Sequence, residues 1–305
     1  MQSTPKLFNE WHWEITRRCN LSCSHCLTQC GTLLEDELTT DRAIQSIDIM
    51  KNLGCSNVMI TGGEPLIRED FFDLVEYMNK SNISLGLLTN GFLVDEYTAE
   101  KLAIYIKSFG VSLDGSSETT HDELRGHGSF FRACNSIALL KSYGSVTVYI
   151  TVSAFNLKEL RSIIDLAFSI GAKRVHISEI NIIGRAKDNC HRFIMNTEEK
   201  EVFKTFATQY DNDGFVMESS CGLDLSSVYL SYNGSIYPCS EIAINTPKRM
   251  LTNINDHNCR AKMLEVSKQW KIPQGNCCYS IYVYNNIVVY LNVDKDCVLT
   301  KGNWS

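Results

Sequence analysis

The sequence lacks any run of apolar residues long enough to cross a membrane, and its first eight residues lack the apolar stretch of a signal peptide. It also lacks an excess of basic charge, because 29 Lys and Arg stand against 35 Asp and Glu, for a net charge of −6. This balance gives no electrostatic reason to bind nucleic acid or an anionic membrane. Low-complexity linkers are missing as well. We therefore expect a cytoplasmic protein with neither nucleic acid nor a membrane as a partner.

Cysteine, by contrast, is abundant. The chain has 305 residues, of which 44% are hydrophobic and 21% charged, so it can fill a sizeable core like an ordinary globular protein. Its 13 cysteines are the outlier. In a cytoplasmic protein of this size they indicate metal or redox chemistry rather than disulfides. Three lie close together near the N-terminus and six lie in the last third, which predicts two metal-binding regions.

From about residue 10 to residue 183 the pattern alternates strand-like and helix-like segments. A repeated strand-then-helix unit predicts parallel strands with right-handed crossovers. Six units are too few to close an eight-strand barrel, so we expect an open, partial (β/α)6 barrel over residues 1–190. The predicted strands are short, rich in β-branched residues, and lie at 11–16, 57–61, 84–89, 110–113, 146–152 and 174–178. The predicted helices lie at 40–53, 69–80, 96–108, 129–142 and 157–170.

The strand–helix rhythm breaks after residue 187. A helix is predicted at 197–210, and a hairpin at 228–237, because the pair Asn233-Gly234 favours a tight two-residue turn. A helical stretch at 260–269 and a further segment at 281–292 follow. The expected fold class is therefore α/β, with a small C-terminal α+β domain over residues 191–305 that packs directly on the barrel.

Three cysteines follow the first predicted strand with the spacing Cys19-x3-Cys23-x2-Cys26. Soft thiolates suit iron–sulfur clusters, which usually take four of them. A loop with three cysteines leaves one iron open to a substrate or cofactor. The alternative is zinc, with Cys30 as a fourth ligand, although zinc sites usually combine paired Cys-x2-Cys knuckles or cysteine and histidine.

This loop resembles the signature of the radical S-adenosylmethionine (SAM) superfamily. The resemblance implies a partial six-unit barrel and a [4Fe–4S] cluster on Cys19, Cys23 and Cys26. It also implies that the methionine amine and carboxylate of SAM chelate the open iron, and that the reduced cluster splits the sulfonium into methionine and a 5′-deoxyadenosyl radical. His25 occupies the position that packs on the adenine in this family; the alternative for a single histidine is a surface position.

The segment Thr-Gly-Gly-Glu-Pro at 61–65 follows the second predicted strand. A Gly-Gly pair at a strand end lets the backbone approach a ligand closely, and the carboxylate can accept a hydrogen bond from an ammonium group. Alone, the segment would be a simple turn; after the cysteine loop, it resembles the family's Gly-Gly-Glu motif, which holds the methionine amine. Later strand ends match further cofactor positions in the family, although each residue could instead be a cap or a surface charge. The expected cofactor-binding residues are His25, Gly62, Gly63, Glu64, Pro65, Asn90, Ser112, Asp114, Arg125, Asn156 and Arg185.

The second cysteine region surrounds the predicted hairpin. The spacing from Gly234 to Cys239 is Gly-x4-Cys, which resembles the opening of the SPASM or twitch extensions that bind auxiliary clusters in this superfamily. The chain departs from the full SPASM pattern, because two later cysteines are adjacent, and adjacent cysteines rarely both ligate one cluster. The resemblance therefore implies one auxiliary [4Fe–4S] cluster. Its expected ligands are Cys221, Cys239, one of Cys277 and Cys278, and Cys297.

Four other cysteines have no expected ligand role. Cys55 and Cys134 are interpreted as buried free thiols of the barrel. Cys190 and Cys259 are either inert or catalytic, as donors of a hydrogen atom to a substrate radical.

The resemblance implies an enzyme, a radical SAM oxidoreductase or maturase, without naming its substrate. We expect hydrogen abstraction from a ribosomally made peptide or a small secondary metabolite, leading to dehydrogenation, cross-linking or epimerisation. The alternatives are an activase of a partner enzyme and a non-catalytic iron–sulfur or zinc protein. A flavodoxin or ferredoxin is the expected electron donor. Fewer than a dozen residues precede the first predicted strand, so a separate protein is expected to present any leader peptide.

Overall fold

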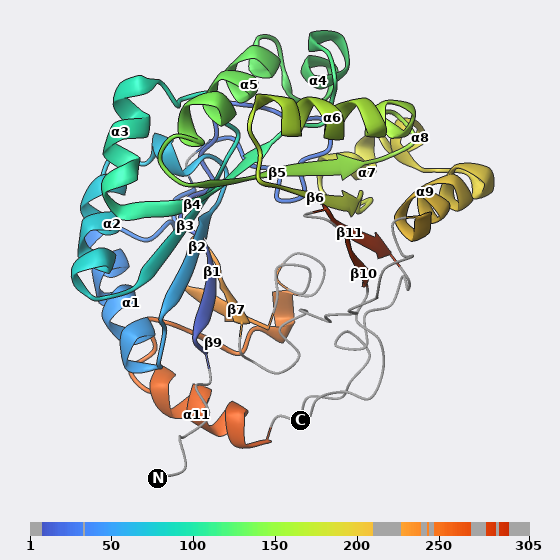
Figure 1. The fold of residues 1–305 in the computed structure, drawn as a ribbon. Helices are drawn as coiled ribbons and strands as arrows, with labels where there is room; N and C mark the ends of the chain where they lie inside the picture. The colour runs from blue at the N-terminus through green and yellow to red at the C-terminus, as the bar shows by residue number, and fades with distance from the viewer. Residues whose placement is uncertain are drawn as a thin grey trace.

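The computed structural model describes residues 8–32, 34–209, 227–238, 243, 247–269, 279–284 and 287–292. Its first part alternates strands and helices, with the strands inside an arc of helices (Figure 1). The first six strands are parallel, and each pairs with the next one in the sequence. They are β1 (Glu10–Glu14), β2 (Asn57–Thr61), β3 (Ser84–Thr89), β4 (Ile106–Ser112), β5 (Ser145–Val152) and β6 (Arg174–Glu179).

Side chains alternate between the two faces of each strand, as the period of two requires. In β1, Trp11 and Trp13 are fully buried in the core, whereas His12 and Glu14 line a cavity on the inner face. The same alternation recurs in β5, where the core takes the valines and Ile150, and Tyr149 lines the cavity. The apolar face packs against the helices and leaves the inner face for polar side chains.

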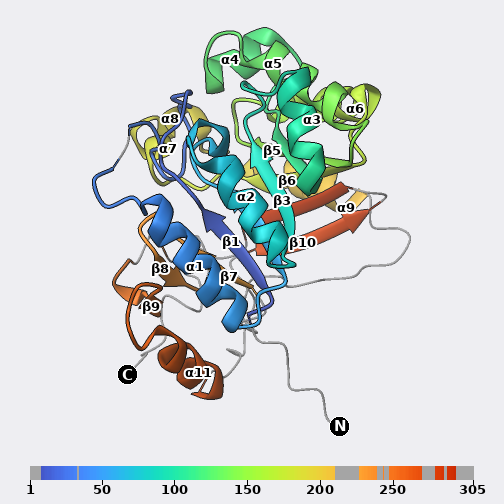
Figure 2. The same cartoon turned by 90° about the vertical axis from the view of Figure 1, so that its left-hand side faces the viewer.

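The helices form the outer layer, and Figure 2 shows α1, α2 and α3 lying in front of the first strands. Their buried faces join the same apolar core as the outer faces of the strands. None of the helices within the described ranges is long and apolar enough to cross a membrane. The helices of this part are α1 (Thr40–Asn52), α2 (Phe71–Lys80), α3 (Glu96–Tyr105), α4 (Glu118–Arg125), α5 (Ser129–Leu140), α6 (Leu160–Ile170), α7 (Arg185–Asp188), α8 (Cys190–Phe193) and α9 (Thr197–Gln209).

One predicted helix runs too far, and one helix is missing from the predictions. The helix expected at 96–108 ends at Tyr105, and β4 begins at the next residue, because Ile106 is fully buried and pairs with Leu85. Tertiary pairing thus overrides the helical pattern at its last three residues. Helix α4 was not predicted; it begins after Ser117, whose hydroxyl accepts a hydrogen bond from the backbone N–H of Thr120.

The later strands extend the first sheet at both edges. The predicted hairpin is present as β7 (Ser227–Leu230) and β8 (Ser235–Tyr237), with Gly234 at a φ of 85° in its turn. Strand β7 pairs in parallel with β1, and β9 (Thr252–Asn253) pairs antiparallel with β8. At the other edge, β11 (Ile287–Asn292) pairs in parallel with β6, and β10 (Tyr279–Tyr284) pairs with β11. Helix α11 (Cys259–Gln269) lies below β9 in Figure 1.

Candidate active site

A cavity of about 490 Å³ lies at the carboxyl ends of the parallel strands. The loop after β1 contributes Cys19, Cys23 and Cys26 to its lining, and the turn after β2 contributes Gly62 and Gly63. In parallel α/β folds, this end of the sheet is where ligands bind. The structure therefore brings the three cysteines and the glycine pair of the sequence analysis into one cavity. It adds five more of the expected residues to the lining: His25, Asn90, Arg125, Arg185 and, at the end of β4, Ser112.

The cysteine loop is closed at its base by backbone hydrogen bonds. The N–H of Cys19 donates to the carbonyl of Gly31, and the N–H of Gly31 donates to the carbonyl of Arg17, both at 2.9 Å. Within the loop, the N–H of Leu21 donates to the Sγ of Cys19 at 3.4 Å. The loop thus holds its thiols in place through its own backbone.

The thiols of the loop suit a metal cluster. Cys19, Cys23 and Cys26 are free of disulfides. Burial raises the pKa of Cys19 to about 11 and also raises the pKa of Cys23. The neighbouring side chains of Cys30 and Thr28 lower the pKa of Cys26. Buried thiols become thiolates readily when a cation compensates their charge, so the donor set and its burial fit an iron–sulfur cluster.

The glycine pair approaches the backbone of the cysteine loop. A Cβ on Gly62 would lie 2.5 Å from the carbonyl oxygen of Thr16, and one on Gly63 would overlap the carbonyl oxygen of Arg18. The N–H of Gly63 donates to the carbonyl oxygen of Thr16, and the N–H of Glu64 donates to the carbonyl oxygen of Arg18, both at 2.8 Å. The two glycines thus allow close approach to the loop that carries the cysteines; their approach to a ligand stays a prediction.

The carboxylate of Glu64 points away from the cavity. It is fully buried, and it accepts hydrogen bonds from the Thr89 hydroxyl at 2.9 Å and from the N–H of Asn90 at 2.8 Å. It also accepts one from the N–H of Leu66. In the structure, the partners of this carboxylate are protein groups, and it fixes the end of β3. Pro65, at the start of a short 3-10 turn, is buried as well and does not line the cavity.

Glu64 gives a pH-dependent prediction. Burial raises its pKa to about 7, so between roughly pH 4.3 and pH 7 the folded state holds a proton that the unfolded state has lost. The free energy of unfolding should therefore fall as the pH rises through this window, by about 3 to 4 kcal/mol. Replacing Glu64 by Gln removes this dependence. The difference in free energy of unfolding between parent and variant should therefore change with pH below 7 and stay constant above it.

Urea denaturation of the cluster-free chain at several pH values checks this prediction. Glu35→Gln, at an exposed position, serves as the control and should follow the parent at every pH. A difference between the parent and Glu64→Gln that is the same at pH 5 and pH 7 would contradict the assignment.

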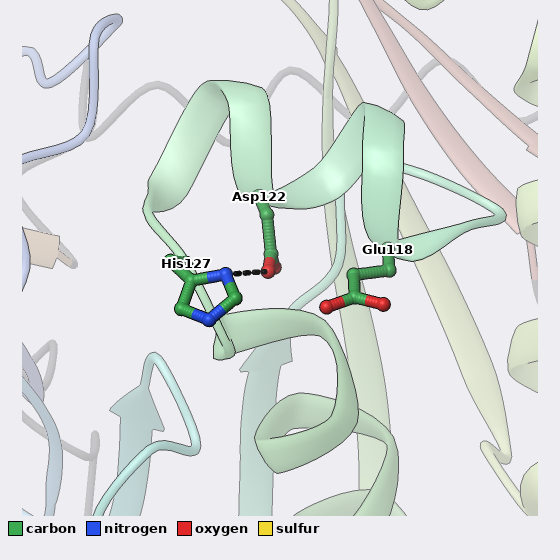
Figure 3. A group of neighbouring side chains, drawn as sticks. All are labelled: Glu118, Asp122 and His127. Atoms are coloured by element: carbon green, nitrogen blue, oxygen red, sulfur yellow. Dashed lines mark ion pairs between the residues drawn. The ribbon is translucent and has the colours of Figure 1, made fainter.

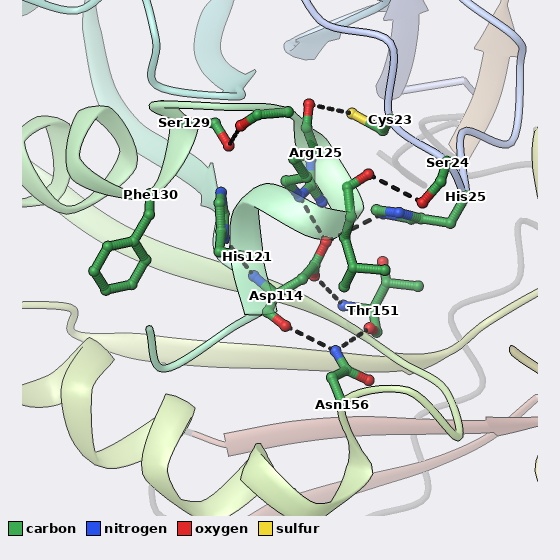
Figure 4. Close-up of polar contacts among 12 residues, drawn as sticks. Cys23, Ser24, His25, Asp114, His121, Arg125, Ser129, Phe130, Thr151 and Asn156 are labelled. Carbon is green, nitrogen blue, oxygen red and sulfur yellow. Dashed lines mark hydrogen bonds and ion pairs between the residues drawn. The ribbon is translucent and has the colours of Figure 1, made fainter. Parts of the chain in front are cut away.

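Asp114 organises the wall of the cavity beside the cysteine loop (Figure 4). Its Oδ2 lies 2.6 Å from the Nε of Arg125 and 3.1 Å from the Nε2 of His25, and its Oδ1 accepts from the N–H of Thr151 at 2.7 Å. The Asn156 amide donates to the carbonyl of Asp114 at 2.9 Å. Burial alone would raise the pKa of Asp114, but Arg125 and His25 hold it well below its usual range. The carboxylate is thus charged, and it fixes an arginine and a histidine at the cavity wall.

The four expected cofactor-binding residues of this network lie in two different places. His25 and Arg125 line the cavity, whereas Asp114 and Asn156 lie behind the wall and are fully occupied by protein partners. Asp114 and Asn156 therefore position the lining instead of forming it. His121, next to this network, accepts from the N–H of Asp114 at 3.1 Å, and burial lowers its pKa to about 4.

Arg185 fastens the cysteine loop to the end of β6. Its Nε donates to the carbonyl of Cys23 at 2.8 Å and its Nη1 donates to the carbonyl of Cys30 at 2.9 Å. Its backbone N–H donates to the carbonyl of Cys26 at 3.0 Å. Gly184, with a φ of 58°, leaves room for that carbonyl, which a Cβ would overlap. Arg185 thus holds three positions of the loop at once.

The model of the radical SAM superfamily matches residues 13–167. The chain belongs to the radical SAM superfamily. The resemblance of the cysteine loop and of segment 61–65 to this superfamily is thereby confirmed.

The radical SAM chain has several curated relatives. It is 35% identical over 193 residues to the AdoMet-dependent heme synthase of Methanosarcina barkeri, covering 62% of this chain and 54% of that protein. It is 33% identical over 180 residues to the mycofactocin maturase MftC of Mycolicibacterium smegmatis, covering 58% and 45%. It is 27% identical over 246 residues to the subtilosin biosynthesis protein AlbA of Bacillus subtilis, covering 75% and 54%. The chain thus spans about half the length of the curated relatives it matches.

Solved structures share the fold. SuiB of Streptococcus suis bound to S-adenosylmethionine aligns with a TM-score of 0.65 at 16% identity, covering 87% of this chain and 66% of that one. The enzyme anSMEcpe with bound AdoMet aligns with a TM-score of 0.66 at 19% identity, covering 86% and 82%. At these identities the likeness concerns the fold, and it confirms the predicted α/β class with a parallel sheet.

Several lining residues of the radical SAM site were not predicted. They come from inward positions of the strands, where the period of two could have identified them. Tyr149 and His176, opposite each other on β5 and β6, stack with ring centroids 4.5 Å apart. A Cβ on Gly110 would lie 2.6 Å from the Tyr149 ring, so this glycine makes room for the stack. Burial lowers the pKa of His176 to about 4. The other unpredicted polar residues of the lining include His12, Glu14, Thr151, Ser178 and Tyr229.

The structure does not bring the two proposed hydrogen donors to the cavity. Cys259 begins α11, is 2% exposed and belongs to the apolar core. Cys190 begins α8 and does not line the cavity. Cys55 is a buried core thiol, as expected, and Cys134 packs against the core while remaining partly exposed. The auxiliary-cluster ligands named above, Cys221, Cys239, Cys277, Cys278 and Cys297, lie outside the described residues.

A group of acidic and histidine side chains from α4 and the turn after it does not line the cavity (Figure 3). Glu118, Asp122 and His127 lie together there, and His127 is 3.9 Å from Asp122. Asp122 accepts hydrogen bonds from the N–H of Phe130 at 2.8 Å and from the Ser129 hydroxyl at 3.0 Å. It therefore stabilises the start of α5, and we assign this group a structural role.

Proposed function

We propose that the protein is a radical SAM maturase that cleaves S-adenosylmethionine reductively and abstracts a hydrogen atom from a peptide. The observation that carries this proposal is the cavity in which Cys19, Cys23 and Cys26 meet the Gly62–Gly63 turn at the carboxyl ends of the strands. Membership of the radical SAM superfamily supports the same chemistry.

The three thiols would hold a [4Fe–4S] cluster with one iron open to SAM. When bound and reduced, this cluster supplies the electron that splits the sulfonium and yields the 5′-deoxyadenosyl radical. The chain's own residues hold the cysteine loop and orient the side chains that line the cavity. Arg185 and the Gly62–Gly63 turn hold the cysteine loop, and Asp114 holds His25 and Arg125 against the cavity.

A peptide substrate is supported by both the relatives and the cavity. Similarity to a mycofactocin maturase and to a bacteriocin biosynthesis protein favours a maturase. Two proteins of similar fold bind peptides, SuiB its precursor peptide SuiA and anSMEcpe the Cp18Cys peptide. A cavity of about 490 Å³ is in the lower half of the range for small-molecule sites. Since it would also hold SAM, it leaves room for one side chain of a longer substrate better than for a tetrapyrrole, despite the similarity to a heme synthase.

The C-terminal part would complete this enzyme. We propose a partial (β/α)6 barrel over residues 1–190, and an auxiliary-cluster domain over residues 191–305. One auxiliary [4Fe–4S] cluster would take four ligands: Cys221, Cys239, one of Cys277 and Cys278, and Cys297. Cys221 precedes the Gly-x4-Cys segment, Cys239 ends it, and the others follow it. A flavodoxin or ferredoxin would supply electrons, and a separate protein would present the leader of the peptide.

Anaerobic reconstitution with iron and sulfide, followed by dithionite and SAM, tests the proposed chemistry. We expect 5′-deoxyadenosine to form, and candidate precursor peptides to increase its rate. With a deuterated peptide, the 5′-deoxyadenosine should gain mass, because the radical takes its hydrogen from the substrate. Iron and sulfide bound without any 5′-deoxyadenosine would exclude the catalytic function. Deuterium transfer from a small metabolite, and from none of the peptides, would exclude the peptide substrate.

A further inference from the structure

Two side chains of the cysteine loop form a chain of hydrogen bonds that ends on Cys26. The hydroxyl oxygen of Thr28 lies 2.8 Å from the Sγ of Cys30 and 3.9 Å from the Sγ of Cys26. All three residues line the cavity, and Cys30 is only 3% exposed. Cys30 is thus a fourth thiol beside the three expected ligands, and the proposed cluster, which leaves one iron to SAM, does not need it as a ligand.

The direction of these hydrogen bonds follows from the protonation state of Cys26. A cysteine that ligates iron is a thiolate and has no proton to donate. The sulfur of Cys26 can therefore only accept, and the hydroxyl of Thr28 must donate to it. The oxygen of Thr28 can then accept from the S–H of Cys30, which keeps its proton because it is not a ligand. The donors are thus ordered from Cys30 through Thr28 to Cys26.

The backbone holds this chain of side chains together. Gln29 has a φ of 54°, a left-handed conformation that turns the loop back on itself. Arg185 then fixes both ends of the turn, because its N–H donates to the carbonyl of Cys26 and its Nη1 donates to the carbonyl of Cys30. The side chains of Thr28 and Cys30 are therefore kept beside the sulfur of Cys26 by groups outside the loop.

We propose that Thr28 and Cys30 are positioning residues that set the reduction potential of the cluster: Thr28 donates a hydrogen bond to the sulfur of Cys26, and Cys30 supports it by donating to the oxygen of Thr28. The inference rests on the proposed function, since it requires a cluster on Cys19, Cys23 and Cys26. Hydrogen bonds to the ligand sulfurs stabilise the more negative, reduced cluster and raise its potential. Cys19 has donors of its own in the N–H of Leu21 and, at 3.8 Å, the amide of Asn90. Thr28 supplies the corresponding donor for Cys26, and Cys30 orients the hydroxyl of Thr28 by donating to its oxygen.

A redox titration of the reconstituted protein, followed by electron paramagnetic resonance without SAM, tests this role. The signal of this cluster is the one that a variant lacking Cys19, Cys23 and Cys26 loses. Thr28→Val and Cys30→Ala should lower the ratio of reduced to oxidised cluster at a fixed potential by about two- to tenfold, the effect of one hydrogen bond. Thr28→Ser and Cys30→Ser keep a donor at each place and should titrate close to the parent.

Three results would overturn the inference, and each is distinguishable. Unchanged titrations of Thr28→Val and Cys30→Ala, at full iron content, would show that the hydrogen bonds do not act on the cluster. Loss of the cluster signal in Cys30→Ala alone would show that Cys30 is a ligand. A parent protein without the signal would refute the proposed function itself. If Thr28→Val fails to fold, the comparison of Cys30→Ala with Cys30→Ser decides.

Discussion

Replacing Cys23 by alanine is expected to reduce the formation of 5′-deoxyadenosine by more than about a hundredfold, since even residues that only support a metal ligand are typically worth 10- to 100-fold. The iron content should fall by one cluster. Cys23 is nearly buried and lies in the cavity with Cys19 and Cys26. Two thiolates cannot hold a cluster that leaves one iron open for SAM, because each of the other three irons needs its own sulfur.

Cys134→Ala is the matched control. This cysteine lies on α5, packs against the core and does not line the cavity, so its replacement should leave iron, sulfide and activity at the parent's level. Measurements of iron and sulfide per chain, together with chromatography of 5′-deoxyadenosine, distinguish the two variants. Equal activity in the parent and in Cys23→Ala would refute the ligand assignment.

The cysteine loop could be predicted because its chemistry is local in the sequence. Three thiols within eight residues directly after a strand define a metal loop whatever the rest of the chain does. The parallel arrangement of the strands could also be predicted, since alternating strand and helix segments allow few topologies. The edges of that sheet could not. Strands β7 and β11 join β1 and β6 from the distant end of the chain, and no local pattern specifies such a pairing.

The direction of side chains at the strand ends could not be predicted either. Glu64 and Asp114 both follow strands, as cofactor-binding residues would, but both carboxylates are fully buried and bonded to protein groups. A residue at a strand end has two faces available, and the choice depends on partners far away in the sequence. His25 is the example: it comes from the cysteine loop, far from Asp114 in the sequence, and it forms an ion pair with that carboxylate. Both carboxylates therefore act by positioning the residues that line the cavity.

Gly63 gives the second large expected effect, because its position tests how the cysteine loop is held. Alanine at Gly63 should cost about 3 kcal/mol of folding free energy, the usual scale for overpacking, and should prevent assembly of the cluster. A Cβ there would overlap the carbonyl oxygen of Arg18 and lie 3.0 Å from the Cβ of Cys19. These are backbone and ligand atoms, which cannot move without breaking the hydrogen bond from the N–H of Gly63 to Thr16.

Gly31→Ala provides the comparison for this substitution. Gly31 lies in the same loop region and has no atom within 4 Å of the place of a Cβ, and neither glycine has a positive φ. The two variants therefore make the same chemical change and differ in the space available, so helix propensity or backbone strain cannot explain a difference. Thermal unfolding of the cluster-free chains and iron content after reconstitution should both fall for Gly63→Ala and remain near the parent for Gly31→Ala. If Gly63→Ala assembled a full cluster, the turn after β2 would not be what positions Cys19, and the loop would be held by its own backbone hydrogen bonds and by the contacts of Arg185 with Cys23, Cys26 and Cys30.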